Sequence, residues 1–78
     1  MKEIEVTEAS IEGNNIRKML KGVSQEELSR RAGVSSRQLN RVILGQSEPK
    51  ILMAIRLATV LGVPVEDIFT MNIKTRKR

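Results

Sequence analysis

The chain has 78 residues, a net charge of +5, a single aromatic residue, and neither cysteine nor histidine. Such a chain can build one small domain whose core comes from aliphatic side chains and methionine. The composition excludes disulfide bonds, thiol or imidazole catalysis and the usual zinc ligands. The sequence contains no signal peptide and no apolar run long enough to span a membrane, so we expect a cytoplasmic protein without a membrane partner.

Positive and negative charges occupy different parts of the chain. Residues 1–15 are acidic, whereas lysine and arginine dominate residues 17–41 and residues 74–78. Segregated positive charge on a small domain favours a polyanionic partner such as nucleic acid, with a solubilising surface as the plain alternative. The same two interpretations apply to the basic end of the chain, which we favour slightly as a source of accessory phosphate contacts.

The two ends of the chain carry weak structural signals. Residues 3–6 alternate polar and apolar side chains as a strand does, but we identify no second strand to pair with them. We therefore expect residues 1–11 to form a flexible extension and residues 70–78 to form a disordered basic tail. The folded domain is expected to span residues 12–69.

Three helix starts can be placed in the first half of this domain. Apolar residues at helical spacing predict a helix over residues 16–22, with Asn14 or Asn15 as its N-cap. Two capping boxes follow, in which a serine hydroxyl accepts from the backbone N–H three residues on and a Glu or Gln side chain accepts in return from the serine N–H. The boxes are Ser24 with Glu27 and Ser35 with Gln38, and they begin helices over residues 25–32 and 36–44.

Two more helices complete the expected fold. Residues 49–61 predict a helix with Pro49 in its first turn, and residues 63–69 predict a short last helix. In the longer one we expect a buried face of Ile51, Ala54, Ile55, Leu57, Ala58 and Leu61. The predicted fold class is therefore all-α, a compact five-helix bundle.

The helix over residues 36–44 has a continuous polar face. Leu39 and Val42 point to one side, and the opposite side carries Ser36, Arg37, Asn40, Arg41 and Leu44. An arginine fork can bond to both guanine acceptors in the DNA major groove, and an asparagine amide can do the same at adenine. Gln38 lies off this face and is assigned to its capping box, whereas the short Ser36 side chain reaches either a base or a phosphate.

Two short helices joined at Gly33, with the small Ser29 where they cross, form a helix-turn-helix pattern. From Glu12 to Phe69, through "LGQSEPKILMAIRLATVLGVPVEDIF", the chain resembles the phage repressor and Cro-like family, also called the Xre family. The resemblance implies a lambda-repressor-like domain that inserts the helix over residues 36–44 into the major groove. It also implies that Gln25 clamps a phosphate and braces the first residues of that helix. The candidate phosphate-positioning residues are Gln25, Ser35, Gln46 and Ser47.

The sequence thus predicts a transcriptional regulator, of repressor type, that binds double-stranded DNA. We expect no cofactor, no small-molecule substrate and no enzymatic activity, because no activated nucleophile or metal cluster can be found. The resemblance implies a homodimer that reads two half-sites. The candidate dimer or partner surface consists of Ile43, Leu44, Leu52, Met53 and Val60. The alternative is an antitoxin-like or adaptor protein that uses this surface to bind a different protein.

Overall fold

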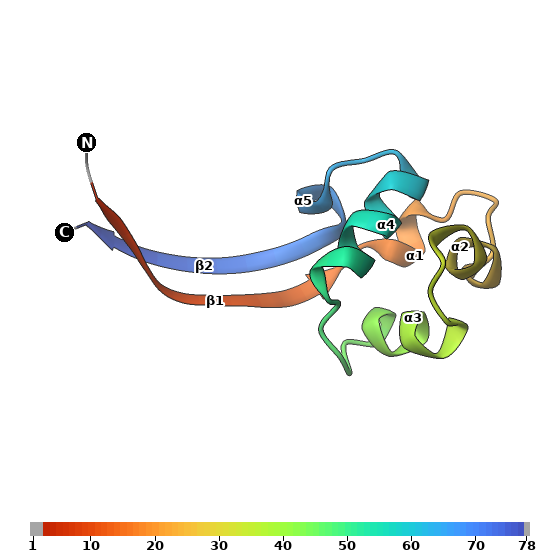
Figure 1. The fold of residues 1–78 in the computed structure, drawn as a ribbon, viewed down its shortest axis with the longest axis horizontal. Coiled ribbons are helices and arrows are strands. Elements are labelled where there is room, and N and C mark those ends of the chain that lie inside the picture. The colour runs from red at the N-terminus through yellow and green to blue at the C-terminus, as the bar shows by residue number, and fades with distance from the viewer. Residues whose placement is uncertain (1–2, 78) are drawn as a thin grey trace.

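The computed structural model describes residues 3–77, in which five helices gather at one end of the molecule (Figure 1). Two strands run side by side out of this helical domain as a long ribbon. The molecule measures 45 × 24 × 20 Å. In chain order the elements are β1 (Ile4–Asn14), α1 (Ile16–Met19), α2 (Gln25–Ala32), α3 (Ser36–Ile43), α4 (Ile51–Leu61), α5 (Val65–Ile68) and β2 (Phe69–Lys77).

The ribbon makes the prediction of an all-α five-helix bundle wrong. β1 and β2 form an antiparallel sheet whose register runs from Ile4 opposite Lys77 to Asn14 opposite Phe69. The segment after Phe69, expected to be a disordered tail, is β2, and it is the partner strand that we had not identified for residues 3–6. Its alternation of apolar and polar side chains was obscured by its basic residues. The division of the chain at residues 11 and 70 stays a prediction.

The core of the helical domain contains one fully buried aliphatic side chain from each helix. These residues are Ile16, Leu28, Leu39, Leu57 and Ile68, all with an exposed fraction of 0%. Phe69, the first residue of β2, is 2% exposed and joins the same core. The base of the ribbon is therefore fixed in the helical domain by the single aromatic ring of the chain.

Two of the expected core positions are wrong. Ile51 is 75% exposed and Ile55 is 48% exposed, although both were assigned to the buried face of α4. Most sides of this helix carry apolar residues, so the spacing of its side chains does not single out one inner face. The helix instead turns Ala54, Leu57 and Ala58 to the core.

Several helix ends also differ from the prediction. α1 is a single turn, because Lys21 and Gly22 adopt positive φ angles of 24° and 84° and the chain turns there. α4 begins at Ile51 with Lys50 as its N-cap, so Pro49 precedes the helix and is not in its first turn. No helix within residues 3–77 combines the length and the apolar character needed to cross a bilayer.

Candidate nucleic-acid interface

The two central helices begin at serine caps, as the sequence predicted. Ser24 Oγ accepts a hydrogen bond of 3.0 Å from the backbone N–H of Glu27, and Ser35 Oγ accepts one of 3.0 Å from Gln38. Each bond satisfies an N–H group that has no partner inside its own helix. The starts of α2 and α3 are thus fixed by local contacts.

The carboxylate of Glu27 has a different role from the one predicted. It accepts hydrogen bonds from Arg30 and from Arg31, whose Nε lies 2.9 Å from Glu27 Oε1. The bond from Arg30, followed by the bond from Arg31, lowers the pKa of the Glu27 carboxyl below its ordinary value. Glu27 therefore organises the basic side chains on the outer face of α2.

The turn between α2 and α3 depends on a glycine and on two serines. Gly33 adopts a left-handed conformation with φ of 69°, and the N–H of Val34 donates to Ser29 O at 3.0 Å. Ser29 is buried where the helices cross, and its Oγ lies 3.1 Å from Ser36 Oγ. Arg56 of α4 donates to Gly33 O at 3.3 Å. These contacts set the orientation of α3 against α2.

The other end of α3 is held by Asn14, the last residue of β1. Its Nδ2 donates to Val42 O at 3.0 Å and to Ile43 O at 3.4 Å. Its Oδ1 accepts from the N–H of Ile16 at 3.2 Å, whereas the N-cap of α1 is Asn15, whose side chain makes no capping bond. The bonds to α3 had no local sequence signal, because 28 and 29 residues separate the partners. Asn14 therefore connects the ribbon base to the last turn of α3.

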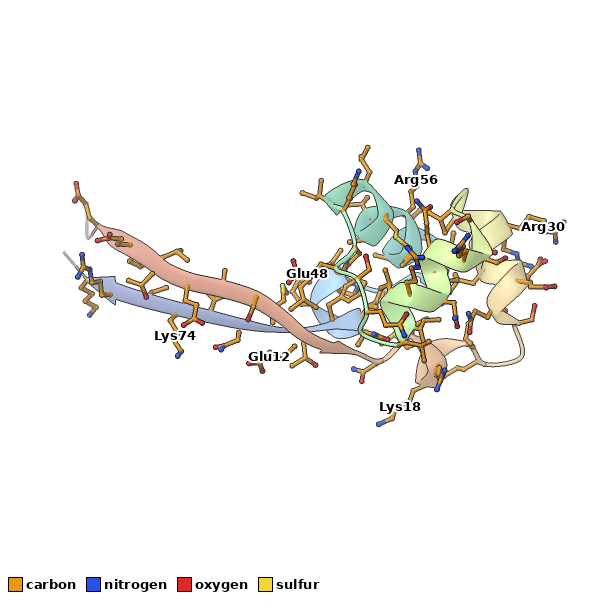
Figure 2. All side chains as sticks on the ribbon, turned by 90° about the horizontal axis from the view of Figure 1, so that it is seen from below. Glu12, Lys18, Arg30, Glu48, Arg56 and Lys74 are labelled. Carbon is orange, nitrogen blue, oxygen red and sulfur yellow. The ribbon has the colours of Figure 1, made fainter. Side chains whose placement is uncertain are left out.

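The outward face of α3 carries the predicted base-reading side chains. Leu39 and Val42 are buried, and the exposed side consists of Ser36, Arg37, Asn40, Arg41 and Leu44. Figure 2 looks at the molecule from the side on which α3 lies, with that helix in front. Within residues 3–77, neither Arg37 nor Arg41 has an ion-pair partner. Both guanidinium groups are free to bind an acceptor outside the protein.

Gln25 contacts this face directly. Its Nε2 donates to Asn40 Oδ1 at 3.2 Å, so the first residue of α2 holds an amide in the middle of α3. The resemblance implies a brace for the first residues of α3, whereas the bond found in the structure holds Asn40, in the middle of the helix. The bond leaves the Asn40 Nδ2 group as a donor and one acceptor lone pair on Oδ1.

The remaining predicted positioning residues flank α3. Ser35 uses its hydroxyl for the helix cap, and the Gln46 N–H donates to Arg41 O at 2.9 Å in the turn that ends the helix. Ser47 is exposed in the loop that follows, with a 3.5 Å bond from its hydroxyl to Glu48 O. The structure thus places these residues beside α3.

Two basic residues that the sequence analysis had not selected adjoin the same face. A groove of 340 Å³ lies between α3 and α4, and Arg41, Lys50 and Arg56 stand along it. Lys50 is at the start of α4 and Arg56 is near its middle. The basic surface therefore extends from α3 onto α4, a continuation that only the packing of the two helices reveals.

The predicted apolar surface is less exposed than expected. Leu44 and Leu52 are 48% and 64% exposed, whereas Ile43, Met53 and Val60 are half-buried and pack against the core. Leu52 and Met53 border the groove that Arg41 also lines. The sequence analysis missed the exposed apolar side chains on the ribbon.

Comparison with known proteins places the chain in a family. The profile of the helix-turn-helix family matches residues 15–68. An HTH-type transcriptional regulator of Methanocaldococcus jannaschii is 34% identical over 50 residues, 64% of this chain and 76% of the relative. One of Methanothermobacter thermautotrophicus is 36% identical over 52 residues, covering 65% and 75% of the two chains. The chain belongs to the helix-turn-helix family, which confirms the resemblance found in its sequence.

Proposed function

We propose that the protein is a transcriptional regulator that binds duplex DNA and reads its sequence with α3 in the major groove. The observation that carries this proposal is the exposed face of α3. Arg37 and Arg41 lie there without an ion-pair partner among the described residues, beside Asn40, which accepts a hydrogen bond from Gln25. The names of the two relatives, both HTH-type transcriptional regulators, support it. Binding to DNA that overlaps a promoter would block transcription, so the protein would act as a repressor.

The reading residues have separate tasks. Arg37 and Arg41 each present a planar fork that matches the O6 and N7 acceptors of guanine. Asn40, oriented by Gln25, donates from Nδ2 to a base edge. Ser36 is partly engaged by Ser29, so its hydroxyl reaches a base or a phosphate from a fixed position.

A second group would hold the DNA backbone without reading its sequence. Ser35, Gln46 and Ser47 lie at the two ends of α3, and Gln25 lies at the start of α2 beside Asn40, so these side chains border the surface that would face the DNA backbone. Lys50 and Arg56 add positive charge on the α4 side. Each phosphate neutralised in this way releases counterions and steepens the dependence of affinity on salt, by about 0.9 in the slope of log K against log salt.

The test is selection of bound duplexes from a random library, followed by affinity measurements at several salt concentrations. Arg37→Ala and Arg41→Ala should each relax the preference at one base pair and weaken specific binding by roughly 1–3 kcal/mol. Gln25→Ala should weaken binding more evenly across sequences. Arg30→Ala is the matched control, because it removes the same charge from α2 and should keep the preferred sequence. Equal affinity of the parent for every duplex would refute the proposal.

The protein is further proposed to act as a homodimer on two half-sites, since one short helix reads few base pairs. The competing function is an antitoxin-like or adaptor protein that binds a different protein. The observation behind that alternative is the set of exposed apolar side chains, which DNA binding by α3 does not require. Duplex selection separates the two, because an adaptor would select no preferred sequence.

A further inference from the structure

One face of the ribbon is largely apolar. Side chains alternate along a strand, so Phe69, Met71, Ile73 and Thr75 of β2 share a face that ends at Lys77. The residues opposite them on β1 continue the same face. They are Asn14 at the base, followed by Ile11, Ala9 and Val6, and Ile4 lies opposite Lys77 at the tip.

Two irregularities in β1 decide which of its residues lie on this face. The register shifts between Val6 and Glu8 and again between Ile11 and Gly13, and each shift inserts one extra residue. Without the first shift, Glu8 would follow Val6 onto the apolar face. The shift instead moves Glu8 to the opposite face, where it pairs with Lys74 at 3.3 Å.

The opposite face is charged and internally paired. Besides the pair of Glu8 and Lys74, Arg76 Nε lies 3.1 Å from Glu5 Oε2. Acidic β1 and basic β2 thus neutralise each other on one side of the ribbon. The acidic residues of β1 and the basic residues of β2, which lie at opposite ends of the sequence, are thus matched in space on this side of the ribbon.

The apolar face lacks a cover from the described residues beyond its base. Ile4, Val6, Met71 and Ile73 are 65%, 58%, 41% and 56% exposed. A two-stranded sheet alone in water is marginal and needs a layer against its apolar face. β2 has nine residues, so at about 3.3 Å per residue and a width of roughly 10 Å the face measures about 300 Å². An uncovered face of this kind marks an interaction surface.

We propose that a second copy of this chain covers the face, with the two ribbons packed face to face and antiparallel. In that arrangement the tip of each ribbon lies over the base of the other, and apolar side chains meet apolar side chains. The inference rests on the proposed dimer and names its interface. It replaces the surface on α4 with one built from β1 and β2.

Charge at the two ends of the face favours this partner. Lys77 stands at the tip on the apolar face. At the base, the exposed Glu48 adjoins the apolar face and shares a shallow hollow with Ile11, Met71 and Ile73. Antiparallel packing brings Lys77 of each copy to Glu48 of the other, which makes two equivalent opposite-charge contacts. Parallel packing would instead place both Lys77 side chains at the same end of the interface, remote from Glu48 of either copy.

The arrangement also directs the two reading helices. The two-fold axis of antiparallel, face-to-face ribbons runs across the strands, from β2 towards β1. In Figure 1, α3 lies on the side of the helical domain on which β1 borders the ribbon. Both α3 helices therefore face the same side, separated by the ribbon. The two ribbon bases then lie about 30 Å apart, from nine residues at about 3.3 Å, with the α3 helices beyond them, which suits half-sites one helical turn, roughly 34–36 Å, apart.

The area of the apolar face predicts how stable the proposed dimer is. Stable protein–protein complexes bury about 800 Å² on each partner, and the ribbon supplies about 300 Å². The free protein should therefore exchange between monomer and dimer, and a duplex with two half-sites should shift it to the dimer by mass action. The pairing accordingly acts as a ruler that selects half-site spacing.

The test combines sedimentation with binding to duplexes that contain one or two selected half-sites. Ile73→Asp places a charge in the proposed interface, and Thr70→Asp places the same charge on the opposite face of β2 as a control. Ile73→Asp should weaken dimerisation at least tenfold and abolish cooperative binding to two half-sites, while affinity for one half-site stays unchanged. Thr70→Asp should change dimerisation less than twofold.

A charge exchange tests the antiparallel arrangement without altering the apolar residues. Lys77→Glu and Glu48→Lys should each weaken the dimer, and the double variant should recover it. Failure of that recovery overturns the arrangement even if Ile73→Asp disrupts the ribbon itself. The proposed interface is overturned if the parent protein is monomeric both free and on a duplex with two half-sites. It is also overturned if Leu52→Glu dissociates the dimer and Ile73→Asp does not, or if the apolar face of the ribbon binds only a different protein. Loss of sequence preference with an intact ribbon dimer would instead overturn the proposed DNA reading alone.

Discussion

The helical domain and the ribbon are stabilised in different ways. In the helical domain each helix contributes a fully buried aliphatic side chain, and most polar contacts that shape α2 and α3 come from neighbours in the sequence. The ribbon has paired strands but leaves the large apolar side chains beyond its base, Ile4, Val6, Met71 and Ile73, 41–65% exposed. The helical domain is stabilised by its own buried core, whereas the stability of the amphipathic ribbon depends on a further surface packed against its apolar face.

The junction of the two regions gives the largest expected effect. Phe69→Ala removes the buried ring that fixes β2 in the core and should lower the free energy of unfolding by about 3–5 kcal/mol. Met71→Ala, two residues further along the same face, is 41% exposed and should cost less than about 1 kcal/mol in the monomer. Urea denaturation followed by circular dichroism measures both. Equal losses would mean that the ribbon and the core are one unit.

Within α4, burial should separate two aliphatic residues. Leu57 is 0% exposed and Ile51 is 75% exposed. Leu57→Ala should cost about 2–5 kcal/mol through lost burial and the resulting cavity, and Ile51→Ala less than about 1 kcal/mol. The same denaturation experiment decides. A large loss at Ile51 would show that this residue is covered, contrary to its position in the structure.

The link between ribbon and α3 should give a smaller effect. Asn14→Ala leaves the carbonyls of Val42 and Ile43 without their side-chain donor and should cost roughly 1–3 kcal/mol. It should also weaken specific DNA binding, because the last turn of α3 loses its support. Asn15→Ala is the control, since that exposed side chain bonds only to Asp67 O. Unchanged amide exchange in α3 of Asn14→Ala would contradict the link.

Removal of the N-cap of α3 should lower the free energy of unfolding by less than Asn14→Ala does. Ser35→Ala deletes the acceptor of the Gln38 N–H at the start of α3 and should lower stability by about 1 kcal/mol. Ser47→Ala, in the loop that follows, should be close to neutral because the Ser47 hydroxyl makes only a 3.5 Å contact. Thermal unfolding compares them, and a neutral Ser35→Ala would show that packing alone places α3.

The smallest effect concerns pH and the surface of α2. Because Arg30 and Arg31 lower the pKa of Glu27 in the folded protein, the ion pairs contribute stability above the unfolded pKa of the carboxyl. That contribution is lost as the pH falls through the lowered folded pKa. Parent and Glu27→Gln should therefore differ slightly at neutral pH and converge in acid. A difference that grows in acid would reverse the sign of the argument.

Sequence reasoning succeeded where the determining contacts are local. The serine caps lie three residues from their partners, and the alternation of buried Leu39 and Val42 with an exposed polar face follows from helical phase alone. Local patterns of this type predict the starts of α2 and α3 and the exposed face of α3. The roles of the base-reading residues stay predictions.

The failures have non-local causes. Pairing of β1 with β2 joins residues such as Glu5 and Arg76, which are 71 positions apart, and no local pattern connects them. Asn14 reaches α3 across the fold in the same way. In α4 the opposite problem arises, since Ile51 and Ile55 are as apolar as the buried residues beside them. Only the packing of neighbouring elements decides which side is inside.

The pairing of Ile4 with Lys77 also has a topological consequence. The strands bring the two ends of the described chain together at a point remote from α3, so the helical domain is a single closed loop between them (Figure 1). Closing so long a loop is entropically slow, and the ribbon should zip only after the helices have packed around Phe69. A short turn joining these ends, with new termini opened between α3 and α4, would convert the same ribbon into an ordinary hairpin that folds early. The surface of α3 would remain as it is.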